Sequence, residues 1–245
     1  GEYDAFGIVI EGSGVKSSFG STVIDVTSKI QTTDYNDVDG LKLWGADTEY
    51  SDLTITARSN GADINGISLV GHNDRGQVAV SGDLLVTANG KLDVAGKTNI
   101  DVSNENDGAI MYGVYAQTGS ELAFTDDAQI TMTTHEGDSN AKMYGVYSRT
   151  KADVTFAKGL TVKNGNLGAA VIAEGGKVEV NKDGGNDVKL EGTIEARAIE
   201  DSPGSGNLVN GTVKVNFDTA QSYLVGNSYT ATDSTTDLKL SLIHI

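Results

Sequence analysis

Apolar and polar residues alternate along this chain in short runs, and the runs are separated by Gly, Asp and Asn. Strands with one buried face have this period of two, and the separating residues favour tight turns. Three such runs lie at 114–116, 122–124 and 130–132, and corresponding runs follow later in the chain. The pattern therefore predicts a repeat of three short strands and three turns.

The spacing of the repeat is visible in one pentapeptide. Residues 111–115 (MYGVY) return at residues 143–147, 32 positions later. Related runs are introduced by Gly7, Gly40, Gly66, Gly113, Gly145 and Ala170, at spacings of 33, 26, 47, 32 and 25 residues. Repeats of this size are typical of stacked supersecondary units. The spacing of 47 contains two pairs of second and third runs, at 77–88 and 91–103, so we expect it to hold an extra, incomplete turn.

Stacked three-strand units predict an all-β fold, a parallel β-solenoid of about seven coils over residues 1–237. The inner column of the first strand should contain Ile8, Leu41, Ile67, Val114, Val146 and Val171. The inner column of the third strand should contain Ile55, Val102, Met132, Val162 and Leu190, beside an outer polar column of Thr54, Asp101, Thr131, Thr161 and Lys189. A β-sandwich or an up-and-down barrel also has many short strands, but neither explains why the three-strand unit returns in phase.

Composition narrows the class of partner. The chain has 34 acidic and 18 basic residues, so its net charge of −16 repels nucleic acid and anionic membrane surfaces. It contains no cysteine, which excludes a thiol nucleophile, and no apolar run of the length that spans a membrane as a helix. We expect no nucleic-acid partner.

The last eight residues, 238–245, are assigned to a separate tail. The sequence LSLIHI at its end resembles the translation of a sequencing adapter, and such a scar would be excluded from fold reasoning. Alternation at Leu238, Leu240 and Leu242 equally fits a closing strand.

Short motifs for catalysis are incomplete. Gly96-Lys97-Thr98 lacks the glycine that a phosphate loop requires five positions before its second glycine. His72 and His135 have no metal-ligand spacing, and the acidic residues fall chiefly in turns, where Asp bonds the local backbone. These features do not predict an active site.

Acidic segments precede several of the glycine-led strands. Stacking would place the segments at 34–39, 105–107 and 136–138 along one edge, and carboxylates there could bind calcium. The candidate ligands are Asp37, Asp39, Asp107 and Asp138. Their spacing matches no EF-hand loop, and solvated turn residues are the alternative interpretation.

The outer column of the first strand contains a second candidate site. It comprises Lys42, Ser68, Tyr115, Tyr147 and Ile172. Tyr115 and Tyr147 would form an exposed aromatic step on adjacent coils, and Lys42 would lie in the same column. Such tyrosines could simply cover the sheet, or they could bind sugar rings or a partner protein.

The segment YGVYAQTGSELAFTDDAQITMTT occupies residues 112–134, and partial copies of it extend over about residues 3–236. These repeats resemble the passenger regions of bacterial autotransporters, especially adhesin-like ones. The resemblance implies a single-stranded right-handed parallel β-helix on the surface of a diderm bacterium. It also implies export through a C-terminal outer-membrane β-barrel, so this chain would be a fragment lacking that barrel.

Together, these expectations predict that the protein is a non-enzymatic surface adhesin or stalk. Its expected partner is a glycan or surface protein of a host or neighbouring cell. The alternative is a β-helical polysaccharide lyase or hydrolase, which should bring two or three acids, or an acid and a base, together in one groove. A third possibility is a spacer that binds nothing.

Overall fold

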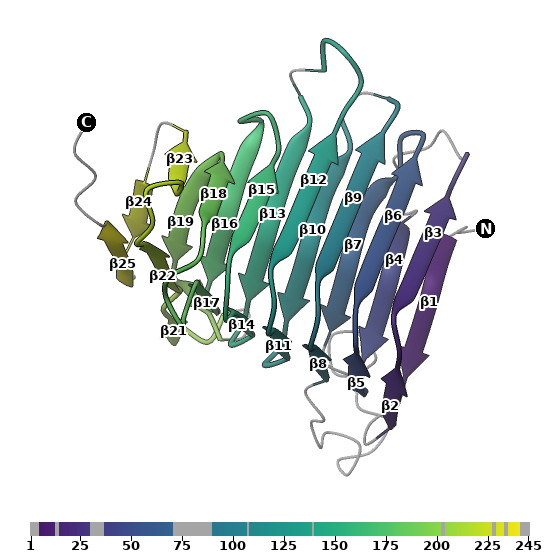
Figure 1. Cartoon of the computed structure of the whole chain (residues 1–245), viewed down its shortest axis with the longest axis horizontal. Coiled ribbons are helices and arrows are strands. Elements are labelled where there is room, and N and C mark those ends of the chain that lie inside the picture. The colour runs from purple at the N-terminus through teal and green to yellow at the C-terminus, as the bar shows by residue number, and fades with distance from the viewer. Residues whose placement is uncertain are drawn as a thin grey trace.

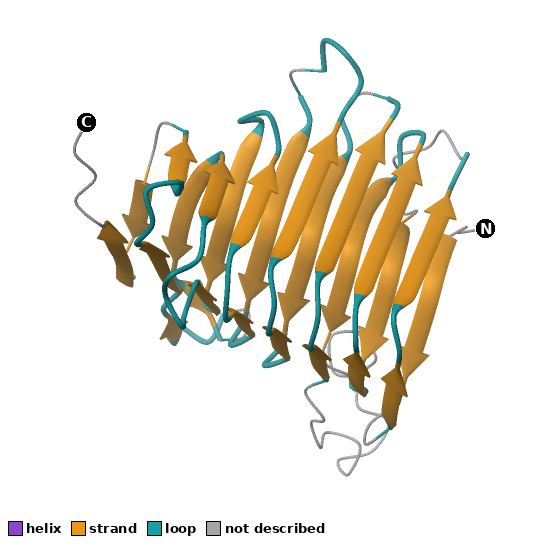
Figure 2. Ribbon diagram, viewed as in Figure 1, coloured by secondary structure: helices purple, strands orange, loops and turns teal. Residues whose placement is uncertain are grey.

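The computed structural model describes residues 5–12, 15–29, 37–70, 90–106, 108–138, 140–201, 204–226, 229–232 and 235–240. All regular elements within these ranges are β-strands, so none of the residues described forms a helix that could cross a membrane. Figures 1 and 2 show the strands side by side along the long axis of the molecule.

Three parallel sheets make up the structure. The first contains β1 (Ala5–Glu11), β4 (Asp37–Trp44), β7 (Asp63–Val70), β10 (Ile110–Gln117), β13 (Lys142–Arg149), β16 (Gly168–Glu174), β19 (Thr193–Arg197) and β24 (Tyr229–Thr232), in this order. The second contains β2 (Lys16–Phe19), β5 (Asp47–Tyr50), β8 (Lys91–Val94), β11 (Glu121–Phe124), β14 (Asp153–Phe156), β17 (Lys177–Val180), β22 (Thr212–Phe217) and β25 (Thr235–Leu240). The third contains β3 (Thr22–Thr27), β6 (Leu53–Ser59), β9 (Thr98–Asn104), β12 (Ala128–Thr133), β15 (Leu160–Lys163), β18 (Val188–Glu191) and β23 (Tyr223–Val225).

Each coil takes one strand from each sheet, and each strand pairs with its equivalents in the coils before and after it. The described residues form seven such coils, followed by β24 and β25, and the predicted right-handed parallel β-helix is confirmed. A short antiparallel pair, β20 (Ile199–Glu200) and β21 (Leu208–Val209), lies between β19 and β22. Of the two pairs of runs from which an extra turn was predicted, 91–103 corresponds to β8 and β9, and 77–88 lies outside the described residues.

The first strands align as the sequence predicts. Ile8, Leu41, Ile67, Val114, Val146 and Val171 pair successively in register. All but Ile8, on the first coil, are fully buried. Burial of this continuous apolar column, together with the buried columns of the other two sheets, stabilises the rod.

The introducing glycines lie inside their strands rather than at the start. In β10, Met111 points inward, Tyr112 points outward, and then Gly113 and Val114 are both buried. Two consecutive inward positions interrupt the alternation, so a period-two reading stops at the glycine and misses the first half of the strand. A Cβ on Gly113 would lie 2.4 Å from Ile130 Cγ2 of the third sheet and 2.6 Å from the Gly145 carbonyl oxygen.

The side chains of the third strands face inward and outward as predicted. However, the residues predicted to form one inner column belong to two separate rows. Ile55 pairs through Ile100 and Ile130 to Val162 and Leu190, whereas Ala57 pairs with Val102, and Val102 with Met132, one inner position further along. The polar column is divided in the same way, since Thr54, Thr161 and Lys189 share one row and Asp101 and Thr131 another. A shift of two residues keeps each side chain on its face, so sequence alternation cannot detect it.

The tail boundary between residues 237 and 238 falls inside β25. This strand pairs with β22, placing Leu238 beside Val215 and Leu240 beside Phe217. Residues 241–245 lie outside the described part.

Adding one methyl group to the glycine column should destabilise the solenoid. We expect Gly113→Ala to lower the free energy of unfolding by about 1–3 kcal/mol, because its Cβ has no space between Ile130 and Gly145. Urea unfolding followed by circular dichroism measures this change. Gly20→Ala is the matched control, because a Cβ there meets no atom within 4 Å. Equal stability of the two variants would contradict the steric explanation.

Candidate functional site

The outer face of the first sheet carries the aromatic residues singled out in the sequence. Lys42, Ser68, Tyr115, Tyr147 and Ile172 pair in register across five coils. Tyr115 and Tyr147 are partly exposed, while the residues on either side of them, such as Val114 and Ala116, are buried. The predicted outward orientation of both tyrosines is therefore confirmed.

Two further tyrosines belong to the same cluster. Tyr112 and Tyr144 stack with ring centroids 5.2 Å apart, and Tyr112 also lies 4.9 Å from Tyr115. Tyr147 contacts Tyr112, Tyr115 and Tyr144 edge to face, each at 5.6 Å. We call Tyr112, Tyr115, Tyr144 and Tyr147 the tyrosine patch. Tyr112 and Tyr144 were not among the predicted residues, because the strand was expected to begin at the glycine that follows each of them, although both lie in the repeated MYGVY.

Hydrogen bonds fix two rings of the patch. The Tyr115 hydroxyl donates to Gln117 Oε1 at 2.8 Å, and the Tyr147 hydroxyl donates to Glu174 Oε2 at 2.5 Å. Glu174 also pairs with Arg149, whose Nε lies 3.2 Å from the same oxygen. The aromatic cluster is thereby joined to the charged residues at the end of the strands.

Two phenols of the patch, those of Tyr112 and Tyr147, resist ionisation. Burial raises the pKa of Tyr112, and the neighbouring Tyr115 and Tyr144 add to the effect. Burial also raises the pKa of Tyr147, and the hydrogen bond to Glu174 raises it further, because a phenolate could not donate that bond. Both rings therefore present neutral hydroxyl groups at physiological pH.

Lys42 is separated from the tyrosine patch by the coil that carries Ser68, and its charge is already engaged. Its Nζ lies 2.9 Å from Asp39 Oδ2 and faces the rings of Phe6 and Trp44, at 4.9 and 5.1 Å from their centroids. The side chain is only 12 % exposed. Of the three residues predicted to bind a ligand, Tyr115 and Tyr147 belong to the tyrosine patch, whereas Lys42 lies apart from it and is largely buried.

Of the four acidic candidates for calcium, Asp39 and Asp138 have described side chains, and each bonds a different set of protein groups. Asp39 projects from the outer face of β4 and bonds Lys42 and Asn65. Asp138 lies in the turn before β13, where its carboxylate accepts bonds from the amides of Gly108, Asn140 and Ala141 and from the Thr134 hydroxyl. The side chain of Asp37 and the whole of Asp107 lie outside the described part of the chain.

The environment of Asp138 indicates a structural role. Burial acts to raise the pKa of its carboxyl, but the hydrogen bonds from Asn140, Thr134, Gly108 and Ala141 outweigh burial and lower it. The bond from Gly108 also shows that the turns of adjacent coils stack, as the sequence predicts. Within the described ranges, no three His, Asp or Glu residues come together as metal ligands.

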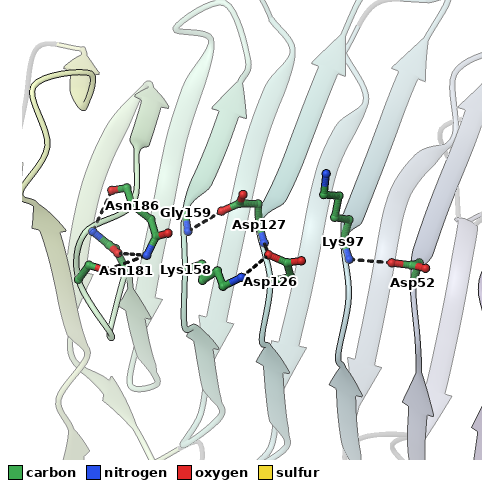
Figure 3. Close-up of polar contacts among 9 residues, drawn as sticks. Asp52, Lys97, Asp126, Asp127, Lys158, Gly159, Asn181 and Asn186 are labelled. Carbon is green, nitrogen blue, oxygen red and sulfur yellow. Dashed lines mark hydrogen bonds and ion pairs between the residues drawn. The ribbon is translucent and has the colours of Figure 1, made fainter.

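A polar edge lies where the second strands turn into the third (Figure 3). The Lys97 amide donates to Asp52 Oδ1 at 3.0 Å, the Gly159 amide donates to Asp127 Oδ1 at 3.1 Å, and Lys158 Nζ lies 2.8 Å from Asp126 Oδ1. The hydrogen bond from Lys158 lowers the pKa of Asp126. Each contact joins one coil to the next, so the edge aligns the turns. A shallow depression of about 440 Å³ beside it is lined by polar side chains that include Asn99, Gln129, Thr161 and Asp187.

Comparison with known proteins identifies no family. No protein-family model, curated protein or solved structure matches the chain.

The Tyr147–Glu174 contact should make the folding stability of the protein depend on pH in the alkaline range. The pKa of Tyr147 is higher in the folded than in the unfolded protein, where it is about 10. This difference contributes stability that is fully present below about pH 10 and is lost as the pH rises from there through the folded-state pKa. Tyr147→Phe removes this contribution. We therefore expect the variant to be less stable than wild type at pH 8 and the difference to narrow above pH 10, as measured by urea unfolding.

The control for this titration is Tyr144→Phe, which removes a hydroxyl group from the same patch. Among the described residues, the contacts of Tyr144 are ring contacts rather than a hydrogen bond to a carboxylate. An equal narrowing in this variant would contradict the assignment to the Tyr147–Glu174 pair.

Proposed function

We propose that this chain is a non-enzymatic passenger segment of a bacterial surface protein, an adhesin-like stalk that binds a glycan or surface protein of a host or neighbouring cell. The observation that carries the proposal is the partly exposed tyrosine patch on an outer face of a continuous rod. Resemblance of the repeated tyrosine-containing units to autotransporter passengers supports the surface location and export through an outer-membrane barrel.

The arrangement of the patch favours binding. Tyrosine supplies a large amphipathic contact surface with few rotatable bonds. Here the rings are held by one another and by the bonds of Tyr115 and Tyr147 to Gln117 and Glu174. Groups that are ordered before binding lose little conformational entropy when a partner arrives, which favours affinity.

The surroundings of the patch favour contact with a partner as well. Ser68 precedes it along the rod, and Ala169 and Ile172 follow it, all nearly fully buried beside the larger rings. The tyrosines therefore form a local aromatic surface between coils with shorter or buried side chains. The net charge of −16 favours solubility of the rod.

The test is a binding screen on glycan arrays and on immobilised extracellular-matrix proteins. We expect wild-type protein to bind at least one ligand, and the double variant Tyr115→Ser/Tyr147→Ser to bind it at least about tenfold more weakly, as for an aromatic hot spot. Tyr223→Ser is the matched control, because Tyr223 is an exposed tyrosine of the third sheet. Circular dichroism confirms that each variant retains its strands.

Two outcomes would contradict the proposal. Absence of binding to every ligand would favour a spacer, and equal binding by the double variant would exclude the patch as the site. Incubation with polysaccharides tests the lyase or hydrolase alternative, because release of shortened products would show turnover rather than binding.

A further inference from the structure

A buried polar triad joins the second and third coils on the outer face of the first sheet. Lys42 Nζ lies 2.9 Å from Asp39 Oδ2, and Asn65 Nδ2 donates a hydrogen bond to Asp39 Oδ1 at 2.7 Å. Asp39 and Asn65 are direct partners across β4 and β7. One carboxylate therefore holds an amine and a carboxamide from neighbouring strands side by side.

The triad is largely withdrawn from water. Asp39 is 0 % exposed and Asn65 is 8 % exposed. The Lys42 amine faces the aromatic rings of Phe6 and Trp44. Transfer of one proton within the Lys42–Asp39 pair would leave a neutral amine and a carboxylic acid beside Asn65.

A neutral amine beside a carboxamide and a carboxylic acid has the components for acyl transfer. The amine is a nucleophile, the Asn65 Cγ is an electrophile, and the acid can move protons between the attacking and leaving nitrogens. The common carboxylate orients both nitrogens, which replaces a bimolecular encounter by a positioned one. Within the described residues, Asn65 Oδ1 accepts no hydrogen bond, so the Asn65 side chain is held through its nitrogen.

We propose that Lys42 and Asn65 form an intramolecular isopeptide bond, with Asp39 as the proton carrier. Asp39 first accepts a proton from Lys42, and the freed lone pair of Nζ attacks Asn65 Cγ. Asp39 then protonates Nδ2 as the Cγ–Nδ2 bond breaks, and it takes the second proton from Nζ. One C–N bond forms, one C–N bond breaks and ammonia leaves, so no oxidant or cofactor is required.

The bond would lock one coil to the next. β4 and β7 are held by backbone hydrogen bonds and packing, and the chain has no cysteine with which to form a disulfide. A covalent link between them closes the segment 42–65 and reduces the conformational entropy of the unfolded chain. Formation of the bond requires only the triad.

The measurement is the intact mass of the folded wild-type protein. We expect it to be lower than the sequence mass by about 17 Da, the mass of ammonia, with peptide fragmentation placing the link between Lys42 and Asn65. Lys42→Arg keeps a positive charge beside Asp39 but cannot form the bond, so it should have its full sequence mass and unfold at a lower temperature. Asp39→Asn should likewise have its full mass, because it has no acid to carry protons.

Lys91→Arg is the matched control, because Lys91 also forms an ion pair with an aspartate, Asp93, but is half exposed and has no role in the triad. It should keep the mass deficit. A folded wild-type protein with its full sequence mass after incubation in acidic, neutral and alkaline buffers would overturn the proposal. A deficit of about 18 Da localised to Lys42 and Asp39 would also overturn it, because water would then be the leaving group and Asp39 the electrophile.

Discussion

The structure depends on in-register parallel pairing between successive coils. Each side chain lies beside the side chain at the equivalent position of the next coil, about 4.8 Å away. The side chain at each position must therefore pack against the side chain at the equivalent position of the adjacent coils. The fold meets this constraint with columns of similar residues, such as Val114 on Val146, and with stacked rings such as Phe124 on Phe156 inside the second sheet, whose centroids are 4.6 Å apart.

The same constraint governs the charges on the outer face of the second sheet. Like charges in direct register would repel, and opposite charges attract. The first residues of successive strands form one outward column, which contains Lys16, Asp47, Lys91, Glu121, Asp153 and Lys177. All but one of the contacts in this series join opposite charges, the exception being Glu121 beside Asp153. In this column the coils therefore meet chiefly through opposite charges, although the other outward column places Glu49 beside Asp93.

The sequence was sufficient to predict the coil because alternation and repeat spacing both reflect the core. It placed Val114 and Val146 inside and Tyr115 and Tyr147 outside, as the structure has them. It could not locate the true start of β10, because Gly113 and Val114 both face inward and break the period of two. It also could not separate Val102 from the row of Ile55, since positions two residues apart have the same orientation.

The candidate site was harder to predict because its geometry depends on contacts between coils. Lys42 was assigned to ligand binding from its outward column, but its partner Asp39 occupies another outward position of the same strand and holds it close to the sheet. Asp39 was assigned to a calcium edge because it precedes a glycine, whereas Gly40 lies within β4 and Asp39 is therefore a sheet residue. Both assignments depended on where the strand begins.

The tyrosine patch shows how one set of residues can support the sheet and also be suited to recognition. Stacking of Tyr112 on Tyr144 covers the strands below, and phenylalanine would provide the same apolar contact. Tyrosine adds hydroxyl groups, and those of Tyr115 and Tyr147 bond to Gln117 and Glu174. Because the four rings contact one another through faces and edges, they cover part of one another's surface. That geometry favours a partner that offers both apolar groups and hydrogen-bonding atoms over one that requires only a flat aromatic surface.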